Sequence, residues 1–438
     1  MLAQFKRLTW KASVLATTVS LLAYTIALAA SGDLDTTFGG GDGLVISYPV
    51  PSDPGRSDHA SDLAIQPNGK IIAGGGSYVY STGNSDFAVL RFNTDGSLDS
   101  TFSGDGRLIT NLGGSDRANG VAIQPNGKIV AVGEKCSSSG PCDVALVRYN
   151  LNGTLDTTFS GDGKQTNDFG GGNNGSSSLA IQSNGKIVVA GYMWNGTDND
   201  LAIYRYLSNG SLDTTFSSNG MVNIGFGAGK QDTAADLVIQ SDGKIVVAGY
   251  TGNVAAANSN FAIARLNTNG SLDTTFGGDG KLTTNFGGDD LASAVTLQAD
   301  GKIMAAGEKF DLGTNISSVA LARYGIDGSL DTTFNGTGKK IFSIVTGKNS
   351  SARDAIIQSD GKIVVAGSFN SDDFAVVRLN SGGNLDTTFS GDGKVTINFG
   401  GFDSGVTLAL EPSDDKYVVA GSINTGADGD FALARVLP

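Results

Sequence analysis

Residues 121–133 read Val-Ala-Ile-Gln-Pro-Asn-Gly-Lys-Ile-Val-Ala-Val-Gly, an Asn-Gly pair between two apolar runs. Asn and Gly tolerate the positive φ that a type I′ turn requires at both central positions, so this stretch predicts a tight β-hairpin. The pattern recurs along the chain, with Asn-Gly or Asp-Gly at the turn in all but the last copy. The copies centre on Gln66, Gln124, Gln182, Gln240, Gln298, Gln358 and Glu411.

Two further motifs keep step with this hairpin. The first, Leu-Asp-Thr/Ser-Thr-Phe, has its leucine at positions 34, 98, 155, 212, 272, 330 and 385. The second is a strand of the type Asp-Phe-Ala-x-x-Arg, with its arginine at positions 91, 148, 205, 265, 323, 378 and 435. The hairpin supplies two strands, the arginine motif a third, and a segment such as residues 394–399 the last. Each unit thus holds four short strands, which is the plan of a β-propeller blade.

The two ends of the chain decide between a propeller and the rival right-handed β-solenoid. Residues 33–49 supply the last strand of a unit, and residues 401–437 supply the first three. The fragments complete one blade if the ends meet, and a closed ring removes the exposed edges that an open array must cap. We therefore predict an all-β fold, a single seven-bladed propeller over residues 31–438 that is closed by its N-terminal strand.

The three motifs together resemble the delta-sixty repeat of bacterial extracellular proteins, a β-propeller family of undefined biochemical function. The resemblance rests on Leu-Asp-Thr-Thr-Phe, on Gln-x-Asn/Asp-Gly-Lys-Ile-Val-Val-Ala-Gly and on Asp-Phe-Ala-x-x-Arg, and it covers Asp33 to Leu437. The hairpin also resembles the blade of NHL-like propellers, which implies that Leu63 to Gln66 and its equivalents belong to the innermost strands. The family implies export and a ring, and it supplies no catalytic residues.

Composition agrees with one large β-domain. Gly contributes 64 of the 438 residues and Pro only 8, which favours many tight turns over a disordered linker. The 39% of hydrophobic residues suffices for an ordinary core, and disordered chains are poorer in such residues.

The first 30 residues have the plan of a cleaved signal peptide. Lys6, Arg7 and Lys11 precede an uncharged stretch, residues 12–30, that ends in small side chains. An uncleaved membrane anchor is the alternative, because the stretch is nearly long enough to span a bilayer, although Thr and Ser dilute it. We predict cleavage and an extracytoplasmic location, with no membrane insertion of the mature chain. Loss of the three basic residues would change the net charge from −13 to −16, which argues against nucleic acid as a partner.

Two kinds of residue pair are expected to have structural roles. Cys136 and Cys142 are the two cysteines of the chain, and in an exported protein they predict a disulfide rather than a metal or redox site. An Asp and an Arg recur in all seven units, which points to a structural role rather than a catalytic one. We expect Arg148 to pair with Asp156, and the equivalent residues to pair around the ring.

Catalytic signatures are scarce. His59 is the one histidine of the chain, so a histidine-based metal site or catalytic triad cannot be built repeatedly, and we interpret His59 as a loop residue. A carboxylate-pair enzyme stays open, but no particular pair stands out. We predict no enzymatic activity and no cofactor, calcium excepted.

A ligand is expected on one face of the ring. The second-to-third and fourth-to-first connections share a face and vary between units, whereas the other connections are near-identical. We call these the variable face and the scaffold face. Unusual aromatic residues gather in the variable connections, where the alternative is that they only pack the loops. These ligand-binding candidates are Tyr78, Tyr80, Tyr192, Trp194, Tyr250 and Phe310.

Five acids stand eight residues before the repeated Gln or its equivalent, where the chain enters the innermost strands. Their carboxylates could cap the loop ends as Asx turns, or they could gather a calcium ion as oxygen ligands. The five are Asp58, Asp116, Asp232, Asp290 and Asp403.

The sequence thus favours an exported, monomeric and non-enzymatic binding module for a glycan or protein ligand. A structural cell-surface or matrix protein is the second hypothesis, and a propeller enzyme acting on polysaccharide is the third. Self-association without a ligand would favour the second, and a carboxylate pair in one cleft would favour the third.

Overall fold

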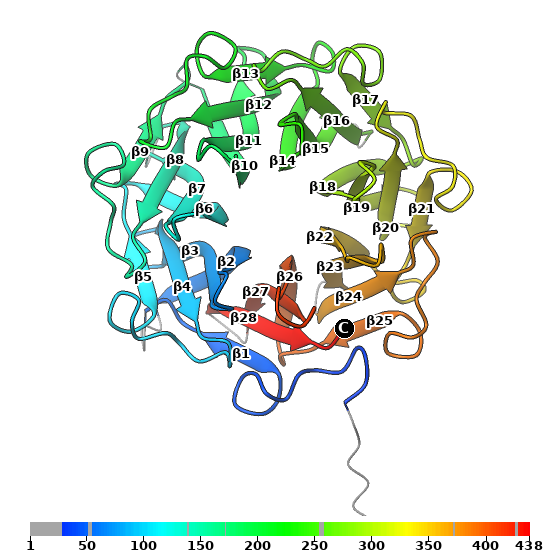
Figure 1. Ribbon diagram of the computed structural model, residues 1–438, viewed down its shortest axis with the longest axis horizontal. Coiled ribbons are helices and arrows are strands. Elements are labelled where there is room, and N and C mark those ends of the chain that lie inside the picture. The colour runs from blue at the N-terminus through cyan, green and yellow to red at the C-terminus, as the bar shows by residue number, and fades with distance from the viewer. Residues whose placement is uncertain are drawn as a thin grey trace, which may run out of the picture.

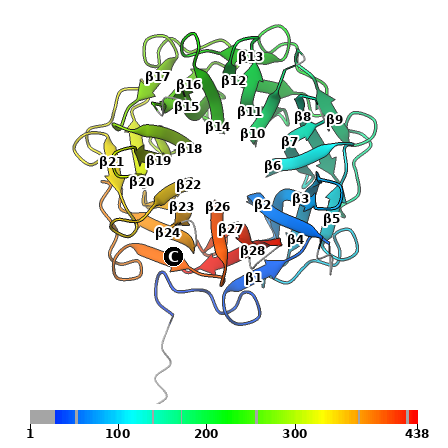
Figure 2. The same ribbon diagram turned by 180° about the vertical axis from the view of Figure 1, so that it is seen from behind.

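The computed structural model describes residues 29–50, 55–137, 140–170, 172–253, 258–370, 373–424 and 428–438. They form seven four-stranded antiparallel sheets arranged as blades around a central axis (Figures 1 and 2). The prediction of an all-β, seven-bladed propeller is confirmed. Residues 1–28, which carry most of the predicted signal peptide, lie outside the described residues, and cleavage stays a prediction.

The blades follow one another along the chain, each written from its inner to its outer strand. Blade 1 is β2 (Arg56–Ile65), β3 (Ile71–Val79), β4 (Asn84–Phe92) and β5 (Arg107–Thr110). Blade 2 is β6 (Ser115–Ile123), β7 (Ile129–Cys136), β8 (Cys142–Tyr149) and β9 (Lys164–Asn167). Blade 3 is β10 (Asn174–Ile181), β11 (Ile187–Trp194), β12 (Asn199–Tyr206) and β13 (Met221–Ile224). Blade 4 is β14 (Gln231–Ile239), β15 (Ile245–Gly252), β16 (Asn260–Leu266) and β17 (Lys281–Thr284).

The remaining blades keep this order until the ring closes. Blade 5 is β18 (Asp289–Leu297), β19 (Ile303–Asp311), β20 (Ile316–Tyr324) and β21 (Lys339–Phe342). Blade 6 is β22 (Ser350–Ile357), β23 (Ile363–Phe369), β24 (Asp373–Leu379) and β25 (Lys394–Ile397). Blade 7 is β26 (Phe402–Leu410), β27 (Tyr417–Asn424), β28 (Gly429–Val436) and the N-terminal β1 (Leu44–Ser47).

Ring closure occurs as predicted. Strand β1 pairs antiparallel with β28, from Leu44 opposite Ala434 to Ser47 opposite Phe431. A further bridge joins Leu34 to Val436, next to the ion pair of Asp35 with Arg435. The first and last strands thus share blade 7, so no blade of the ring is left one strand short.

The hairpin turns differ in type from the prediction. In the turn at Gln124, Gly127 has φ 81°, whereas Asn126 is not among the residues with positive φ. The N–H of Gly127 donates to the carbonyl of Gln124 at 2.8 Å, and the N–H of Gln124 donates to the carbonyl of Lys128 at 2.8 Å. This is a turn closed by a left-handed Gly, which the fixed φ of Pro125 suits better than a type I′ turn.

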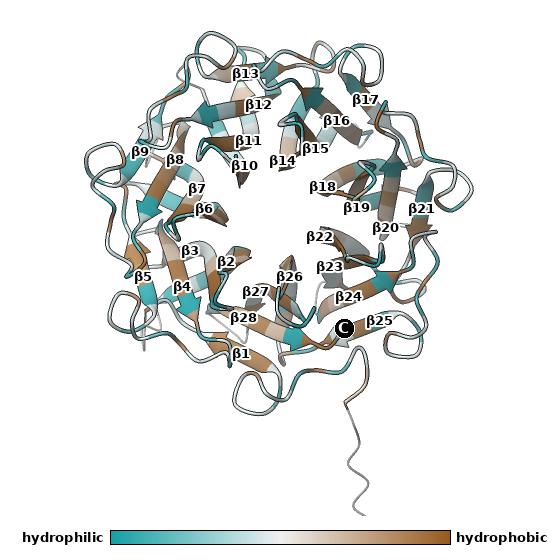
Figure 3. Cartoon of the chain, in the orientation of Figure 1, coloured by the Kyte–Doolittle hydropathy of each residue, from teal (hydrophilic) through white to brown (hydrophobic). Residues whose placement is uncertain are grey.

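The core lies between neighbouring blades. One cluster joins Val130 and Val132 of β7 to Leu179 and Ile187 of blade 3, with Phe159 buried among them. Figure 3 shows that apolar residues are concentrated in the strands and hydrophilic residues in many of the surrounding loops. Because each cluster needs two blades, a single unit cannot bury its apolar surface alone.

The predicted pair of Arg148 and Asp156 is present and buried. The Arg148 Nε lies 2.6 Å from the Asp156 Oδ2, and the guanidinium lies over the Phe159 ring at 4.7 Å. Lys128, from the hairpin turn, reaches the same carboxylate at 2.6 Å. The equivalent Arg–Asp pairs recur in the other six blades at 2.6–2.8 Å.

Burial by itself would raise the pKa of Asp156. Hydrogen bonds from Lys128 and Thr158, together with the charge of Arg148, outweigh it and hold that pKa well below its usual range. The carboxylate is therefore charged at any physiological pH, and Arg148 and Lys128 neutralise it.

Strands extend into what the sequence suggested were loops on the variable face. Residues Gly76 to Val79 continue β3 and pair with β4 as far as Asn84, which leaves only residues 80–83 as the loop. The reason is that cross-strand pairing continues past the repeated Gly for as long as the partner strand lies opposite. Over the described residues, no helix is long and apolar enough to cross a membrane.

Candidate functional site

Two aromatic side chains of blade 3 lie on one face of β11, against glycines of the preceding chain. Tyr192 and Trp194 are two residues apart on this strand, so their side chains point to the same side. A Cβ on Gly175 would lie 2.5 Å from the Tyr192 ring, and one on Gly172 would lie 2.4 Å from the Trp194 ring. The two glycines therefore leave room for both side chains to pack against the backbone, and Trp194 stays 40% exposed.

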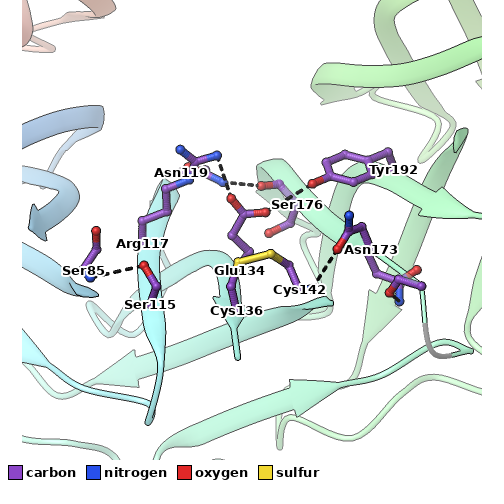
Figure 4. The surroundings of a disulfide bond; sticks show 12 residues. Ser85, Ser115, Arg117, Asn119, Glu134, Cys136, Cys142, Asn173, Ser176 and Tyr192 are labelled. Atoms are coloured by element: carbon purple, nitrogen blue, oxygen red, sulfur yellow. Dashed lines mark hydrogen bonds and ion pairs between the residues drawn. A yellow bond between two sulfur atoms is a disulfide. The ribbon is translucent and has the colours of Figure 1, made fainter. Parts of the chain in front are cut away.

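A polar network joins blade 2 to Tyr192 (Figure 4). The Tyr192 hydroxyl donates to the Glu134 Oε2 at 3.3 Å, and the Arg117 Nη2 lies 2.6 Å from the Glu134 Oε1. The Glu134 side chain is 7% exposed and that of Arg117 is 54% exposed. Burial, with smaller contributions from Glu134 and Tyr250, raises the pKa of Tyr192 to about 12, so its hydroxyl remains a donor. Sequence reasoning missed Arg117 and Glu134.

The predicted disulfide braces the same network. Cys136 and Cys142 face each other at the ends of β7 and β8, and they are bonded. Their sulfur atoms and the Glu134 carboxylate lie within 4.8 Å of one another. The Cys142 N–H donates to the Asn173 Oδ1 at 3.1 Å, and the carbonyl of Asn173 accepts the Trp194 N–H at 3.2 Å. The disulfide thus fixes the hairpin end that positions Glu134 and contacts the connection below Trp194.

The other aromatic candidates are spread over three blades. Tyr250 occupies in β15 the place that Tyr192 has in β11, close enough to influence the pKa of Tyr192. Tyr78 and Tyr80 pack edge to face with ring centroids 5.4 Å apart, which agrees with the loop-packing alternative for this pair. Phe310 lies on β19, half-buried. The structure therefore places Trp194 beside Tyr192 on one strand and Tyr250 near Tyr192, and the remaining candidates lie on blades 1 and 5.

The interpretation of His59 as a loop residue is wrong. It lies within β2, and its imidazole packs on Gly76 beside Arg117, the residue at the equivalent place in β6. Burial and the Arg117 charge lower its pKa to about 4, so the ring is neutral at physiological pH. His59 therefore places a neutral, polar side chain near Arg117.

The five acids proposed as calcium ligands belong to five different blades, and no three of them have carboxylate oxygens within 4.8 Å of one another in the described part of the chain. All are at most 4% exposed. In four of them the carboxylate accepts a backbone N–H of the preceding connection at 2.6–2.7 Å, from Leu112, Phe226, Phe286 and Phe399. The hydroxyl of Ser350 accepts the equivalent N–H in blade 6, at 3.0 Å. These contacts favour the capping interpretation, and the calcium hypothesis stays a prediction.

The central channel carries three acids that sequence reasoning missed. A cavity of about 240 Å³ lies on the axis and is lined by residues of all seven inner strands, among them Asp62, Asp236 and Asp354. A β-bulge directly before each of these acids turns its side chain into the channel. The sequence does contain a signal for these acids, which is variation at one repeated position. The other four blades have Gly, Ser, Ala and Thr at the equivalent place.

Each channel acid joins its blade to the next. Asp62 accepts the N–H of Val121 at 2.8 Å, and Asp354 accepts the N–H of Leu408 at 2.7 Å. The hydroxyl of Thr407 lies between the two acids, 3.1 Å from the Asp62 Oδ1 and 3.3 Å from the Asp354 Oδ2. This is a carboxylate pair in one cavity, but both carboxyl groups are engaged in contacts that hold the ring together.

These carboxyl groups predict a fall in stability towards alkaline pH. Burial raises the pKa of Asp62 to about 7 and that of Asp354 to about 8. The unfolded chain releases these protons near pH 4, so the stability that these two groups contribute is fully present below about pH 4 and is lost as the pH rises towards 7 and 8. We expect the free energy of unfolding to fall by more than about 1.4 kcal/mol between pH 5 and 9, the equivalent of one pKa unit.

Thermal melts across this pH range test the expectation. A double variant, Asp62→Asn with Asp354→Asn, keeps an oxygen for each backbone N–H and removes the charge, so its Tm should change less with pH. The matched control is Asp105→Asn, which removes an exposed carboxylate. Identical pH profiles of the wild type and the double variant would show that the two acids do not carry the effect.

Six of the seven repeats match a known protein family. Residues 66–102, 124–159, 182–216, 240–276, 298–334 and 358–389 match the family described as "Domain of unknown function (DUF5122) beta-propeller". Each matched segment begins at the hairpin Gln and ends at or near the Phe of the Leu-Asp motif. No curated protein matches the chain.

Solved structures resemble the chain at low sequence identity. Polysaccharide lyase Uly1 is 11% identical with a TM-score of 0.44, over 89% of this chain and 94% of that one. An α-L-arabinanase of Penicillium chrysogenum, complexed with arabinobiose, is 11% identical with a TM-score of 0.46, over 72% and 92%. YCF48 bound to D1 peptide is 12% identical with a TM-score of 0.48, over 93% and 98%.

Proposed function

We propose that this β-propeller repeat protein is an exported, monomeric and non-enzymatic binding module with a glycan ligand on its variable face. The repeat motifs further support its assignment to the delta-sixty type. The observation that carries the proposal is that blades 2 to 4 carry side chains at the variable face that the other blades do not repeat. Here Tyr192 and Trp194 pack against glycines, near a half-exposed arginine and a disulfide.

The geometry supports a sugar more than an apolar side chain. Flat aromatic rings stack on the C–H face of a sugar, while flanking polar groups can bind its hydroxyls. Around Trp194 and Tyr192 the neighbours are polar, with Arg117, Glu134 and Asn173 in direct or adjacent contact. The disulfide and the strand pairing hold this surface in place before a ligand arrives, which lowers the entropic cost of binding.

Substitution of the exposed tryptophan tests the site. Binding is first found on a glycan array with the mature chain, and the affinity for the strongest glycan is then measured by titration calorimetry. Trp194→Ala should weaken binding by more than about 2 kcal/mol, as expected for a central aromatic contact. Because Trp194 is partly exposed at a strand end, we expect an unchanged Tm.

The control is Ile326→Ala on the scaffold face, which removes an apolar side chain that is 62% exposed. Its affinity should equal that of the wild type. Normal binding by Trp194→Ala would remove the site from this sector. Self-association in sedimentation experiments, without any saturable ligand, would favour the structural hypothesis instead.

A further inference from the structure

The mouth of the central channel carries two exposed arginines on a chain whose net charge is −13. Arg117 of β6 is 54% exposed, and Arg353 of β22 lines the channel cavity and is 41% exposed. Each arginine lies near a glutamate in the second strand of a blade, β7 or β19. The two glutamates occupy equivalent positions in these strands. Glu134 is 2.6 Å from Arg117, and Glu308 is 3.8 Å from Arg353. The mouth therefore exposes two guanidinium groups, each beside a glutamate, on an otherwise acidic protein.

Arg117 is oriented by a carboxylate that is itself fully engaged. One oxygen of Glu134 faces Arg117 and the other accepts the Tyr192 hydroxyl, and the side chain is buried. Both contacts hold Glu134 in place, and its burial gives a ligand little access to it. A guanidinium has five N–H donors in a planar fork, and the contact with Glu134 engages one side of it. With half of the Arg117 side chain exposed, its remaining donors face the solvent beside the aromatic rings.

We propose that the ligand is an acidic glycan, and that Arg117 binds a carboxylate group of one of its sugars. This inference rests on the proposed glycan-binding function and names the class of ligand. A planar guanidinium matches a carboxylate with two parallel hydrogen bonds, which a neutral sugar cannot offer. Tyr192 and Trp194 then supply stacking surfaces for rings of the same chain.

The site lies outside the channel cavity. That cavity is lined by Asp62, Asp236 and Asp354, whereas Arg117, Tyr192 and Trp194 are not among its lining residues. The acidic glycan is therefore expected to lie across the mouth from Arg117 towards Trp194 and not to thread the channel. His59, neutral and next to Arg117, adds a hydrogen-bonding group without changing the charge of the site.

The experiment compares acidic sugar chains with their neutral esters. Hexamers of galacturonate and of mannuronate, each with its methyl-esterified form, are titrated into the wild type, Arg117→Met and Trp194→Ala. We expect the wild type to bind at least one acidic hexamer at least about tenfold more tightly than its ester, and less tightly as salt is raised. Arg117→Met should lose this preference, whereas Trp194→Ala should weaken the acidic and the neutral form alike.

Three results would overturn the inference. Equal affinity of acid and ester in the wild type, with Trp194→Ala still impaired, would leave the glycan-binding function and remove the acidic class. An unchanged preference for the acid in Arg117→Met would remove the role of Arg117. Binding of a hexaglutamate peptide, but of no hexamer, would replace the glycan by an acidic peptide.

Melting curves of each variant accompany the titrations, because the proposal needs folded proteins. Should Arg117→Met melt early, Arg117→Gln is the second variant, since it keeps a donor for Glu134 without the charge. Arg353→Met is measured in parallel. If Arg353 also takes part in binding, Arg353→Met should lose part of the preference for the acidic hexamer. An unchanged preference in this variant would confine the site to Arg117.

Discussion

Replacing Arg148 by Leu should lower the free energy of unfolding by about 3–5 kcal/mol, the usual cost of breaking a buried ion pair. The guanidinium is 6% exposed and bonds Asp156 at 2.6 Å, Thr158 at 3.1 Å and the backbone carbonyl of Ser208 in the next blade. Leucine makes none of these contacts, so the carbonyl of Ser208 and part of the Asp156 charge lose their partners in a buried place. The contact with Ser208 also joins two blades, which adds to the expected loss.

Urea denaturation, followed by circular dichroism, measures this change. The matched control is Lys128→Met, which removes the second cation on the same carboxylate. Lys128 is 24% exposed, and partly solvated ion pairs contribute less than about 1 kcal/mol. If both variants unfold at the same urea concentration as the wild type, the Arg–Asp pairs do not stabilise the ring, whatever their geometry.

Deleting residues 33–48 should destabilise the whole ring and cause aggregation. The deletion removes β1, which covers the outer edge of β28, and it removes Asp35, which pairs with Arg435 and Lys416. Phe38, which has no exposed surface, is lost as well. An uncovered strand edge pairs readily with other chains. Arg435 and Lys416 would also lose one of their two carboxylate partners, keeping only Glu411 and Asp414 respectively.

Size-exclusion chromatography and thermal melts test the deletion. We expect a Tm lower than that of the intact chain and a share of oligomers that grows with concentration. The control Ile46→Ser changes a side chain of β1 that is 44% exposed, and it should leave the pairing with β28 intact. A deleted chain that melts like the intact one and stays monomeric would mean that β1 is dispensable for the ring.

Much of the fold could be predicted because its determinants are local. Arg148 and Asp156 are eight residues apart, and Cys136 and Cys142 are six apart, so the hairpin and the tight connection bring each pair together in any blade that forms. Repetition identified the blade, and the half-units at the two ends identified the closure. The turn type was wrong, because Asn-Gly pairs occur in more than one kind of hairpin, and Gly127 alone takes the left-handed conformation.

The candidate site was predictable only in part. Tyr192 and Trp194 stood out as unusual side chains in a repeated background, and they lie where a ligand could reach them. Arg117 and Glu134 did not stand out, because charged residues near strand ends are common on any surface. Their importance comes from the contact of Glu134 with Tyr192, 58 residues further along the chain.

The amino-acid sequence by itself determined the blades, their number and the closure of the ring, since hairpin turns, apolar alternation and the Arg–Asp pairs act within one unit. Only the tertiary structure decided which side chains of different units meet. Asp62 reaches Val121, 59 residues away, and Thr407, 345 residues away, because a bulge turns it into the channel and the closed ring sets blade 7 beside blade 1. Such contacts depend on the angle between blades, which follows from the packing of all the blades in the closed ring.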